Sequence, residues 1–287
     1  MAVTLSAVVL TLGRSPLFIP CLEALRREGV EIVVVDQGVA IDVPAGLADQ
    51  VLRPGRNLGF AAGNNLGFSA ASGKWVAPVN DDLLVEPGWA ERLIAALAAD
   101  PKAGSAQGVN LVLDHPDLAD GCGIAWNRWW QAVQVGHGEP APGPEGPVSE
   151  IFGVSATAAV YRREALREVA PDGEVFDTRL GFYYEDVDLA CRLRAAGWRA
   201  LLVPAARARH AGSLTGRTQS RDRWSRIYGN RWLVAKRYLG GGFWPRVPLL
   251  AARDGADLGH ALLKDERELA AGIVSGWRRA LRGGEPR

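Results

Sequence analysis

Three carboxylates and two tyrosines lie together in the second half of the chain. Glu185, Asp186 and Asp188 follow a Tyr-Tyr pair at the start of an apolar pattern with helical spacing. Gly197 is placed to end that helix as a left-handed cap. The helix dipole favours acids at this position, so solvated capping acids are one interpretation. A carboxylate held beside apolar and aromatic groups can instead act as a general base, and the cluster alone leaves both interpretations open.

A second group of polar side chains follows a strand-like run, Lys74 to Val79. Asn80, Asp81 and Asp82 come directly after this run. Mg²⁺ and Mn²⁺ prefer carboxylate oxygen and keep positions open for substrate phosphate, so these residues form a candidate metal site. His210 follows a later strand-like run and is a candidate for the same metal shell. The alternatives are a turn or helix cap at the two aspartates and a structural histidine.

A loop rich in glycine and asparagine runs from Arg56 to Gly67 and enters a helical pattern. Its sequence, RNLGFAAGNNLG, lets the backbone approach a ligand closely and offers amide groups to anions. The spacing of its glycines differs from the dinucleotide-binding fingerprint, and the chain has no Walker A lysine. A simple helix-entry turn is the structural alternative.

Strands and helices alternate along the first part of the chain. We expect strands at 3–12, 31–35, 51–52 and 74–79, and helices at 15–27, 64–71 and 87–98. Ser15 is expected to cap the first helix, with Pro16 in its first turn. This alternation predicts a largely parallel α/β sheet flanked by helices, in which ligands bind beyond the carboxyl ends of the strands. Asp36 and Asp82 each follow one of these strands and should therefore lie on one rim.

The second part of the chain is less regular. Residues 136–147 are rich in proline and glycine and predict a loop. We expect a strand at 154–161, a helix from Arg163 and a strand at 200–203. Basic helical patterns, broken by glycines and prolines, follow Gly212. The pattern therefore predicts one α/β domain over residues 1–220 and a basic helical C-terminal extension over residues 221–287.

Charge is balanced overall but not along the chain. With 33 Lys and Arg residues against 32 Asp and Glu, the net charge of +1 gives no field that would attract nucleic acid. Residues 221–287, however, hold 14 Lys and Arg against 7 Asp and Glu, together with several tryptophans. Basic and aromatic side chains together suit an anionic membrane surface. A packed helical extension with a solvated basic face is the alternative.

Composition also bears on the compartment. The 287 residues are 48% hydrophobic, enough for a large core, and no apolar run approaches the length of a membrane span. The N-terminus lacks the pattern of a signal peptide. Three cysteines without metal-type spacing favour a reducing compartment. We expect a cytoplasmic protein, in peripheral contact with the inner face of the membrane if the extension binds lipid. The oligomeric state stays open, a homodimer included.

These motifs, in this order, resemble the inverting GT-A glycosyltransferases of family 2, in particular the rhamnosyltransferase-like and galactofuranosyltransferase-like members. The resemblance covers nearly all of residues 3–235. It rests on the first strand with Thr11, the acid-ended second strand, the Arg56–Asn65 loop, Asn80-Asp81-Asp82, the segments Phe152–Ala156 and Arg163-Glu164, the Glu185–Asp188 cluster, His210 and Tyr228–Arg231. Their combination and order, rather than any single motif, carry the resemblance.

The resemblance implies a nucleoside-diphosphate sugar as donor. Asp36 would hydrogen-bond the donor's base, and Asp82 and His210 would bind a divalent metal, Mg²⁺ or Mn²⁺. Other contacts to the nucleotide and diphosphate would come from Thr11, Asn57, Gly59, Gly63, Asn64, Asn80 and Asp81.

The resemblance also implies how the acceptor is activated. Asp186 matches the position of the catalytic base, and Glu185 and Asp188 would position it or the acceptor. The acceptor side would include Ser155, Tyr184 and Trp130.

Three features depart from the family pattern. The usual Asp-Asn-Gly-Ser after the second strand is Asp36-Gln37-Gly38-Val39 here, so contacts to the ribose or base would differ. The metal motif begins with Asn80 rather than Asp, which leaves Asp82 as the main ligand. Trp126, Trp129 and Trp130 form an aromatic patch, either a sugar-stacking platform or a packed hydrophobic hairpin.

The expected function is metal-dependent, inverting transfer of a hexose to a hydroxyl of a glycan, a lipid-linked glycan or a small glycoside. The resemblance favours dTDP-rhamnose as donor. A non-catalytic nucleotide-sugar or glycan-binding relative is the alternative. A sugar-phosphate nucleotidyltransferase would need a glycine-rich basic loop after the first strand, where this chain has Thr11-Leu-Gly-Arg-Ser15.

Overall fold

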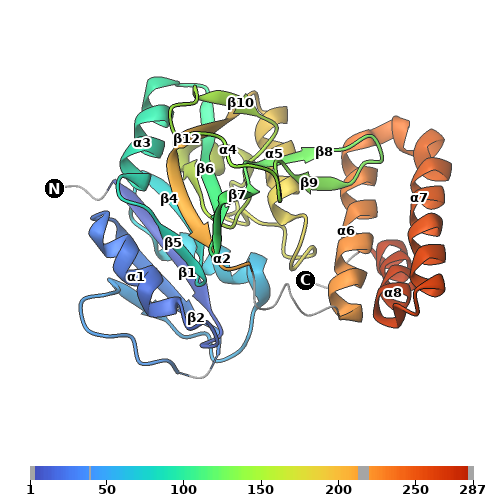
Figure 1. Ribbon diagram of the computed structural model, residues 1–287, viewed down its shortest axis with the longest axis horizontal. Helices are drawn as coiled ribbons and strands as arrows, with labels where there is room; N and C mark the ends of the chain where they lie inside the picture. The colour runs from blue at the N-terminus through green and yellow to red at the C-terminus, as the bar shows by residue number, and fades with distance from the viewer. Residues whose placement is uncertain (1–3, 39, 213–219, 284–287) are drawn as a thin grey trace.

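A mixed β-sheet lies at the centre of the computed structural model, which describes residues 4–38, 40–212 and 220–283 (Figure 1). In these ranges the sheet has ten strands: β1 (Leu5–Thr11), β2 (Glu31–Asp36), β3 (Gln50–Leu52), β4 (Trp75–Asn80), β5 (Leu83–Val85), β6 (Ala103–Val112), β7 (His115–Gly121), β10 (Ser149–Ile151), β11 (Ala159–Arg162) and β12 (Arg199–His210). A separate hairpin joins β8 (Ile124–Trp126) and β9 (Ala132–Gln134). The helices are α1 (Phe18–Arg27), α2 (Gly59–Ala70), α3 (Trp89–Ala99), α4 (Arg163–Val169), α5 (Glu185–Ala195), α6 (Arg221–Leu239), α7 (Phe243–Leu263) and α8 (Arg267–Arg282), with a short 3₁₀ turn at Gly240–Gly242.

The order of the strands places the ends of several of them at one edge. The main path is β10-β12-β6-β11-β4-β1-β2-β3. β1 runs parallel to β2 and β4, and β11 is antiparallel to its neighbours β4 and β6. Thr11 pairs with Asp36, and Leu10 pairs with Asn80. The polar residues that end these strands therefore share one rim, as the alternation predicted.

Different helices cover the two faces of the sheet. α1 and α3 pack on one face and bury residues such as Leu22 and Leu93. α2, α4 and α5 pack on the other and bury Phe68 and Leu189. The second strand, Glu31–Asp36, is buried along nearly its whole length, as is typical of a parallel strand between two helical layers. The predicted α/β sheet with flanking helices is confirmed, but the sheet is mixed rather than largely parallel, because β5, β7, β10 and β11 pair antiparallel with their neighbours.

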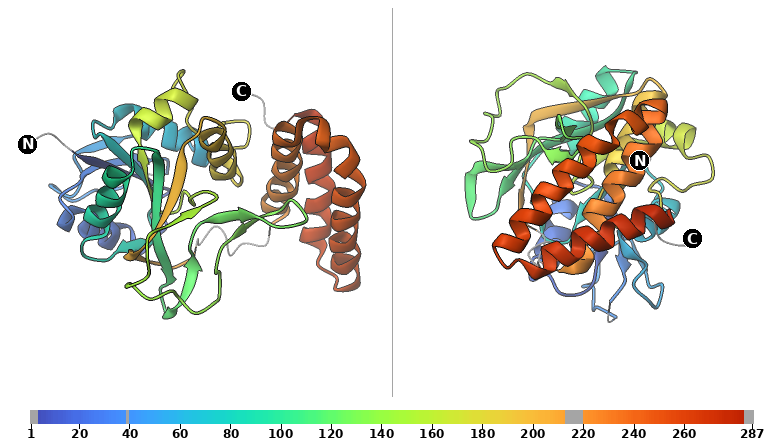
Figure 2. Two further views of the ribbon diagram at one scale, coloured as in Figure 1. Left: turned by 90° about the horizontal axis from the view of Figure 1, so that it is seen from above. Right: turned by 90° about the vertical axis from the view of Figure 1, so that its right-hand side faces the viewer.

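α6, α7 and α8 form a helical unit beside the sheet, and the β8–β9 hairpin reaches from the sheet to this unit (Figure 2). α6 and α8 approach most closely at two glycines: a Cβ on Gly229 would lie 2.9 Å from the carbonyl oxygen of Gly276. Arg231 of α6 and Asp254 of α7 form a buried ion pair at 2.6 Å. α6 begins at Arg221, beside the predicted boundary. The division into two domains stays a prediction.

Some elements differ from the expected ones. Ser15 does not occupy the N-cap of α1, which is Leu17, although the Ser15 hydroxyl accepts a hydrogen bond from the Leu17 amide at 3.2 Å. α2 begins at Gly59 and so includes most of the glycine- and asparagine-rich loop. The long strand β6 was absent from the prediction, because its small and polar residues carry no hydrophobic period. Among the described helices none is long and apolar enough to cross a bilayer.

Candidate functional site

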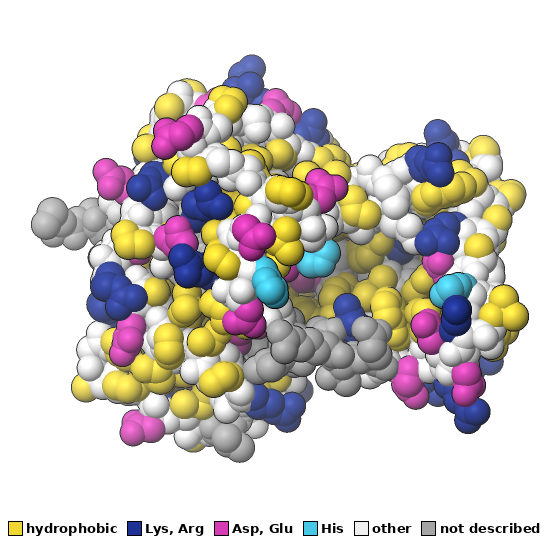
Figure 3. All heavy atoms as spheres, in the orientation of Figure 1, with side chains coloured by type: hydrophobic (Ala, Val, Ile, Leu, Met, Phe, Trp, Pro, Cys, Tyr) yellow, Lys and Arg dark blue, Asp and Glu magenta, His cyan; other side chains and the backbone are white. Residues whose placement is uncertain are grey.

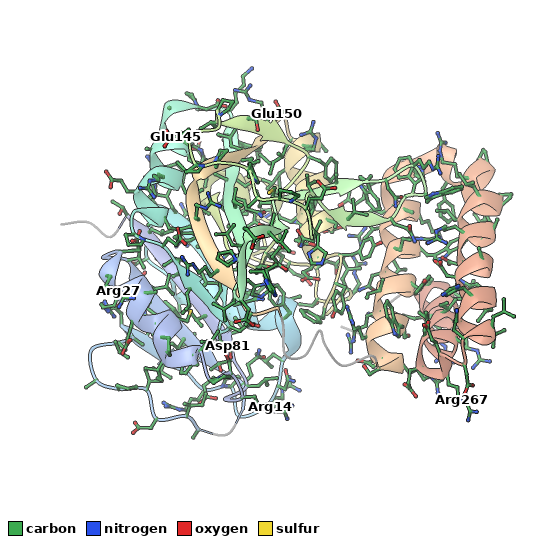
Figure 4. The ribbon with its side chains drawn as sticks, in the orientation of Figure 1. Arg14, Arg27, Asp81, Glu145, Glu150 and Arg267 are labelled. Carbon is green, nitrogen blue, oxygen red and sulfur yellow. The ribbon has the colours of Figure 1, made fainter. Side chains whose placement is uncertain are left out.

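A cavity of about 630 Å³ opens at the carboxyl ends of β1, β2 and β4. Its lining comes from six regions of the chain: the end of β1 and the following loop, the residue after β2, the start of α2, the end of β4, the segment at Gly181, and α6. The residues that line it are Leu10, Thr11, Leu12, Arg14, Ser15, Gln37, Asn57, Leu58, Gly59, Phe60, Asn80, Asp81, Asp82, Gly181, Phe182, Asp222 and Arg226. Figure 4 shows Asp81 and Arg14 toward this end of the sheet. Six of the predicted donor and metal residues thus meet at one cavity.

Asp81 holds the loop after β1 against the end of β4. Its carboxylate accepts a hydrogen bond from the Thr11 hydroxyl at 2.6 Å, and its carbonyl accepts one from the Ser15 hydroxyl at 3.0 Å. Burial raises the pKa of Asp81 to about 6, although the hydrogen bond from Thr11 lowers it and the charge of Asp82 raises it. Asp81 therefore shapes the wall of the cavity between β1 and β4.

The start of α2 brings backbone close to the cavity. Gly59 has a φ of +81°, which favours glycine, and its amide donates to the Asn57 side chain at 2.8 Å. A Cβ on Gly63 would lie 2.8 Å from the Gln37 amide nitrogen and the Leu10 side chain, so a larger residue there would displace these side chains. Asn64 is buried and donates to a carbonyl within α2, and its contact with the nucleotide stays a prediction.

Asp36 is not among the residues that line the cavity, and its contact with the donor's base stays a prediction. It is buried, and its carboxylate accepts hydrogen bonds from the amides of Gly38 at 3.1 Å and Ile41 at 2.8 Å. Arg53 lies 3.5 Å from the same carboxylate. The next residue, Gln37, lines the cavity instead and accepts a hydrogen bond from the Leu58 amide at 2.7 Å. The chain therefore meets the cavity at Gln37, one of the residues that depart from the family pattern.

Asp82 and His210 face each other at the edge of the cavity. The antiparallel pairing of β5 with β12 sets His210 opposite Leu83, so the His210 Nε2 atom lies 3.2 Å from the Asp82 carboxylate. On its other side the Nδ1 atom lies 2.8 Å from the carboxylate of Asp120 in β7. Burial lowers the pKa of His210, but its hydrogen bonds with Asp120 and Asp82 outweigh this effect and raise the pKa to about 9.

This donor set fits a hard divalent cation. One carboxylate oxygen and one imidazole nitrogen at 3.2 Å can share a cation, and Asp120 holds the imidazole as carboxylates commonly do behind a metal-binding histidine. Within the described ranges, no cluster of three or more His, Cys, Asp or Glu side chains could hold a metal by itself. Mg²⁺ and Mn²⁺ sites with few protein ligands are usual where substrate phosphate completes the shell.

The N-terminus of α5 carries two adjacent carboxylates, Asp186 and Glu185, whose pKa values burial raises. Asp186 is half-buried, and its carboxylate accepts hydrogen bonds from the amides of Val187 at 2.8 Å and Ala156 at 3.3 Å. Burial raises the pKa of Asp186 to about 6. Glu185 is buried with one carboxylate oxygen that has no hydrogen-bond partner, and burial beside Asp186 raises its pKa well above the usual range.

Asp186 does not line the cavity, but short connections link it to the end of β4. Ala156, which donates to Asp186, precedes Thr157, whose carbonyl accepts from the Asn80 amide at 2.9 Å. The base candidate and Asn80 therefore lie on either side of one short segment.

Asp188 contacts both α5 and α6, and its role in positioning the base or the acceptor stays a prediction. It is fully buried and forms ion pairs with Arg192 of α5 at 2.9 Å and with Arg237 of α6. The Tyr238 hydroxyl donates to the same carboxylate at 2.7 Å. Both oxygens are therefore occupied, and Asp188 joins α5 to the helical unit.

The segment that leads into α5, which we call the tyrosine turn (residues 180–184), has an unusual backbone. Gly181, Tyr183 and Tyr184 have φ values of +69°, +71° and +72°. Such a conformation costs about 1–3 kcal/mol at each non-glycine residue and persists only where surrounding contacts hold it. Gly181 accepts a hydrogen bond from the Ala61 amide of α2 at 3.0 Å, so the turn also contacts the cavity wall.

The predicted acceptor-side residues lie on or next to the β8–β9 hairpin. The Tyr184 hydroxyl accepts from the Ala132 amide at 3.2 Å, and burial raises its pKa to about 12. Ser155 is buried, and its hydroxyl accepts from Gln134 of β9 at 2.9 Å. Trp130 packs with side chains of α6 and α7. This packing corresponds to the hydrophobic-hairpin alternative rather than to a sugar-stacking platform.

Several lining residues were not predicted. Arg14 follows β1, and Asp222 and Arg226 reach the cavity from α6, where they form an ion pair at 2.9 Å. Asp120 supports His210 from β7. No local motif marks Asp120, Asp222 and Arg226, since they reach the site from elements distant in sequence, whereas Arg14 follows β1 directly.

The sheet, its flanking helices and the cavity at its strand ends form a fold of the GT-A type. The family model described as "Glycosyl transferase family 2" matches residues 6–170. The chain belongs to glycosyl transferase family 2.

Two curated proteins from Mycobacterium tuberculosis are similar in sequence to this chain. N-acetylglucosaminyl-diphospho-decaprenol L-rhamnosyltransferase is 27% identical over 267 residues, which cover 81% of this chain and 82% of the relative. Pre-mycofactocin glycosyltransferase is 29% identical over 230 residues, which cover 76% of this chain and 42% of the relative. The chain is thus similar to a rhamnosyltransferase over most of both lengths.

Solved structures confirm the fold. GalNAc-T7 with UDP, GalNAc and Mn²⁺ aligns with a TM-score of 0.61 at 17% identity, over 75% of this chain and 44% of that one. A mannosyltransferase from Pyrobaculum calidifontis in complex with GDP-Man and Mn²⁺ aligns with a TM-score of 0.59 at 18% identity, over 99% of this chain and 89% of that one. The second alignment includes the C-terminal helical unit.

Proposed function

We propose that this protein is a metal-dependent, inverting glycosyltransferase that moves a sugar from a nucleoside-diphosphate donor to an acceptor hydroxyl. The observation that carries the proposal is the meeting of three features at one end of the sheet. These are the cavity, the facing pair Asp82 and His210, and the carboxylate of raised pKa on Asp186. Residues 1–220 would form the GT-A domain, and residues 221–287 the helical extension.

The cavity suits a nucleotide sugar. Its volume of about 630 Å³ lies within the range of about 300–1,000 Å³ typical of small-molecule sites. Arg14 and Arg226 bring guanidinium groups to its wall, which would contact the diphosphate. Gln37, Asn57 and the α2 backbone would contact the nucleoside.

Asp82 and His210 would hold Mg²⁺ or Mn²⁺, and Asp120 would fix the orientation of the His210 ring. A divalent cation bound there supplies charge neutralisation for the departing diphosphate.

Asp186 would act as the base. It would take the proton from the acceptor hydroxyl as that oxygen attacks C1 of the sugar on the face opposite the diphosphate, so the bond from C1 to the diphosphate breaks with inversion. The raised pKa of Glu185 favours its neutral form, which leaves the negative charge of the pair on Asp186.

Rhamnose from dTDP-rhamnose is the donor that we propose, and the similarity to a rhamnosyltransferase supports it. The name of that relative favours a lipid-linked glycan as acceptor, while other glycans and small glycosides remain candidates. The alternative is a non-catalytic, nucleotide-sugar-binding relative. The half-buried Asp186 beside Glu185, whose pKa burial raises, favours the enzyme, since donor binding alone requires neither carboxylate.

Calorimetric titration with dTDP, UDP and GDP, each with and without Mn²⁺, tests the donor site. We expect dTDP to bind, and Mn²⁺ to strengthen binding. Asp120→Asn should weaken Mn²⁺ binding by about 10–100-fold, because the ring of His210 loses its orienting partner. Asp117→Asn makes the same change at an exposed position of β7 and should bind like the wild type. Absence of binding by all three nucleotides to the folded protein would refute the proposed donor site.

The exposed face of α7 supports a peripheral membrane contact. Pro245, Leu249, Ala252, Ala256 and Leu263 are exposed at helical spacing, although α7 buries its opposite face against α6 and α8. Figure 3 shows hydrophobic side chains beside Lys and Arg on the helical unit. The excess of seven positive charges in residues 221–287 favours an anionic lipid surface as the occupant. We propose this contact at the cytoplasmic face of a membrane.

Sedimentation with vesicles of phosphatidylglycerol and phosphatidylcholine tests this contact. Leu249→Glu with Leu263→Glu should weaken binding at least about tenfold, because each Leu loses its burial in lipid. Leu281→Glu changes an equally exposed leucine on α8 and should bind like the wild type. The proposal fails if the wild type does not sediment. It fails too if the wild type is a dimer that the double variant makes monomeric, since α7 would then be an interface between copies.

A further inference from the structure

Asn230 of α6 is fully buried beneath the tyrosine turn. Its side-chain amide donates to the carbonyls of Leu180 at 2.8 Å, Phe182 at 3.1 Å and Tyr183 at 2.7 Å. Its two N–H bonds thus serve three carbonyls of one short segment. Tyr183 and Tyr184 are consecutive bulky residues in a left-handed conformation, which persists only where surrounding contacts hold it. The Asn230 amide supplies hydrogen bonds that hold this backbone.

α8 supports this contact from behind. Arg279 donates to the Asn230 side-chain oxygen at 3.1 Å and to the carbonyls of Arg179 at 2.8 Å and Leu180 at 3.3 Å. The close approach at Gly229 and Gly276 allows α6 and α8 to reach the turn together, because a Cβ on either glycine would collide with the facing helix. The orientation of Asn230 is therefore set by the helical unit.

The tyrosine turn connects two parts of the site. Tyr184 is the N-cap of α5, so the backbone of the turn determines where Glu185 and Asp186 begin. At its other end, Gly181 and Phe182 line the cavity. A displacement of this turn would move Asp186 relative to the donor.

We propose that Asn230 is a positioning residue for the transfer reaction: its amide holds the tyrosine turn in the backbone conformation that places Asp186 at the site. The inference rests on the proposed role of Asp186 as base. It gives the C-terminal helical unit a part in catalysis that the Tyr228–Arg231 motif alone did not reveal.

Two variants of the full chain test the proposal. Asn230→Ala removes the donor, and Asn230→Asp keeps the shape and the contact with Arg279 but lacks the amide donor. Trp277→Phe is the control, since it removes a hydrogen bond to Asp254 within the helical unit without a contact to the turn. Hydrogen exchange and the release of dTDP from dTDP-rhamnose with Mn²⁺, in which water replaces the acceptor, are measured for each.

Both Asn230 variants should exchange the amides of residues 181–188 faster, and Trp277→Phe should not. Release of dTDP should fall about 100-fold in the Asn230 variants, because a small displacement of the base has an effect of this size. The limb of the pH–rate profile near pH 6 should move to lower pH, since Asp186 becomes more exposed. Unchanged exchange in this segment, or an equal loss of rate in Trp277→Phe, would overturn the positioning role.

A failure of the proposed function gives a different result from a failure of the positioning role of Asn230. If Asp186→Asn releases dTDP at the wild-type rate, or the wild type releases none, the role of Asp186 or the donor is wrong. In that case the exchange measurement alone decides whether Asn230 holds the turn.

Discussion

Replacement of Asp186 by Asn should lower the rate of glycosyl transfer by about 10²–10⁴-fold, the usual contribution of a positioned general base. The amide has the shape of the carboxylate and can still accept from Val187, so the start of α5 should keep its structure. Donor binding should be retained, because Asp186 does not line the cavity. The measurement is the steady-state rate together with calorimetric binding of dTDP.

The pH dependence provides a second test of the same role. A base is active as its carboxylate, and burial raises the pKa of Asp186 to about 6. kcat/KM should therefore fall as pH decreases below about 6, by about tenfold per pH unit. Glu164→Gln makes the same carboxyl-to-amide change at an exposed position of α4 and should leave both rate and profile unchanged. Wild-type rates in Asp186→Asn would favour the non-catalytic binding protein.

Replacement of Asp254 by Asn should lower the free energy of unfolding by about 3–5 kcal/mol, the cost of leaving a buried charge without its partner. Asp254 is fully buried, and its ion pair with Arg231 at 2.6 Å is equally inaccessible. Trp232 at 2.7 Å and Trp277 at 2.8 Å donate to its second oxygen. One carboxylate thus joins all three helices of the C-terminal unit, and the neutral amide would leave the Arg231 charge uncompensated.

Urea denaturation followed by circular dichroism measures this effect. Arg267→Ala is the matched control, because it removes an ion pair with Asp265 at 2.9 Å in which both side chains are largely exposed. Such pairs contribute at most about 1 kcal/mol. A comparable, small change in both variants would mean that the Arg231–Asp254 pair contributes no more than a surface pair.

The sequence predicted the parts of this fold that carry a regular pattern. The buried run Glu31–Asp36 and the apolar spacing within α5 are local signals, and both elements form where expected. The polar ends of β1 and β4 share one rim because parallel strands align their carboxyl ends. β6 could not be predicted from its small and polar residues, since its position in the centre of the sheet depends on β11 and β12.

The sequence predicted the type of site and some of its residues, but it did not predict all of them. The residue types at Asp82 and His210 suggested a metal site, and the β5–β12 pairing brings the two together. Asp120 and Arg226 reach the site from β7 and α6, and no local pattern could identify them. Asp36 and Asp188 are acids in the expected positions, yet backbone amides and arginines, respectively, occupy their carboxylates.

The ion pair between Asp188 and Arg237 bears on which residues an active fragment of the chain must contain. The match to the family model stops at residue 170, and the predicted domain stops at 220. A chain shortened to 220 residues would lack the Asp222–Arg226 wall of the cavity and would leave the fully buried Asp188 without its partner from α6. The smallest active fragment should therefore extend through α8, and a helical unit borrowed from a relative would have to supply matching partners for α5.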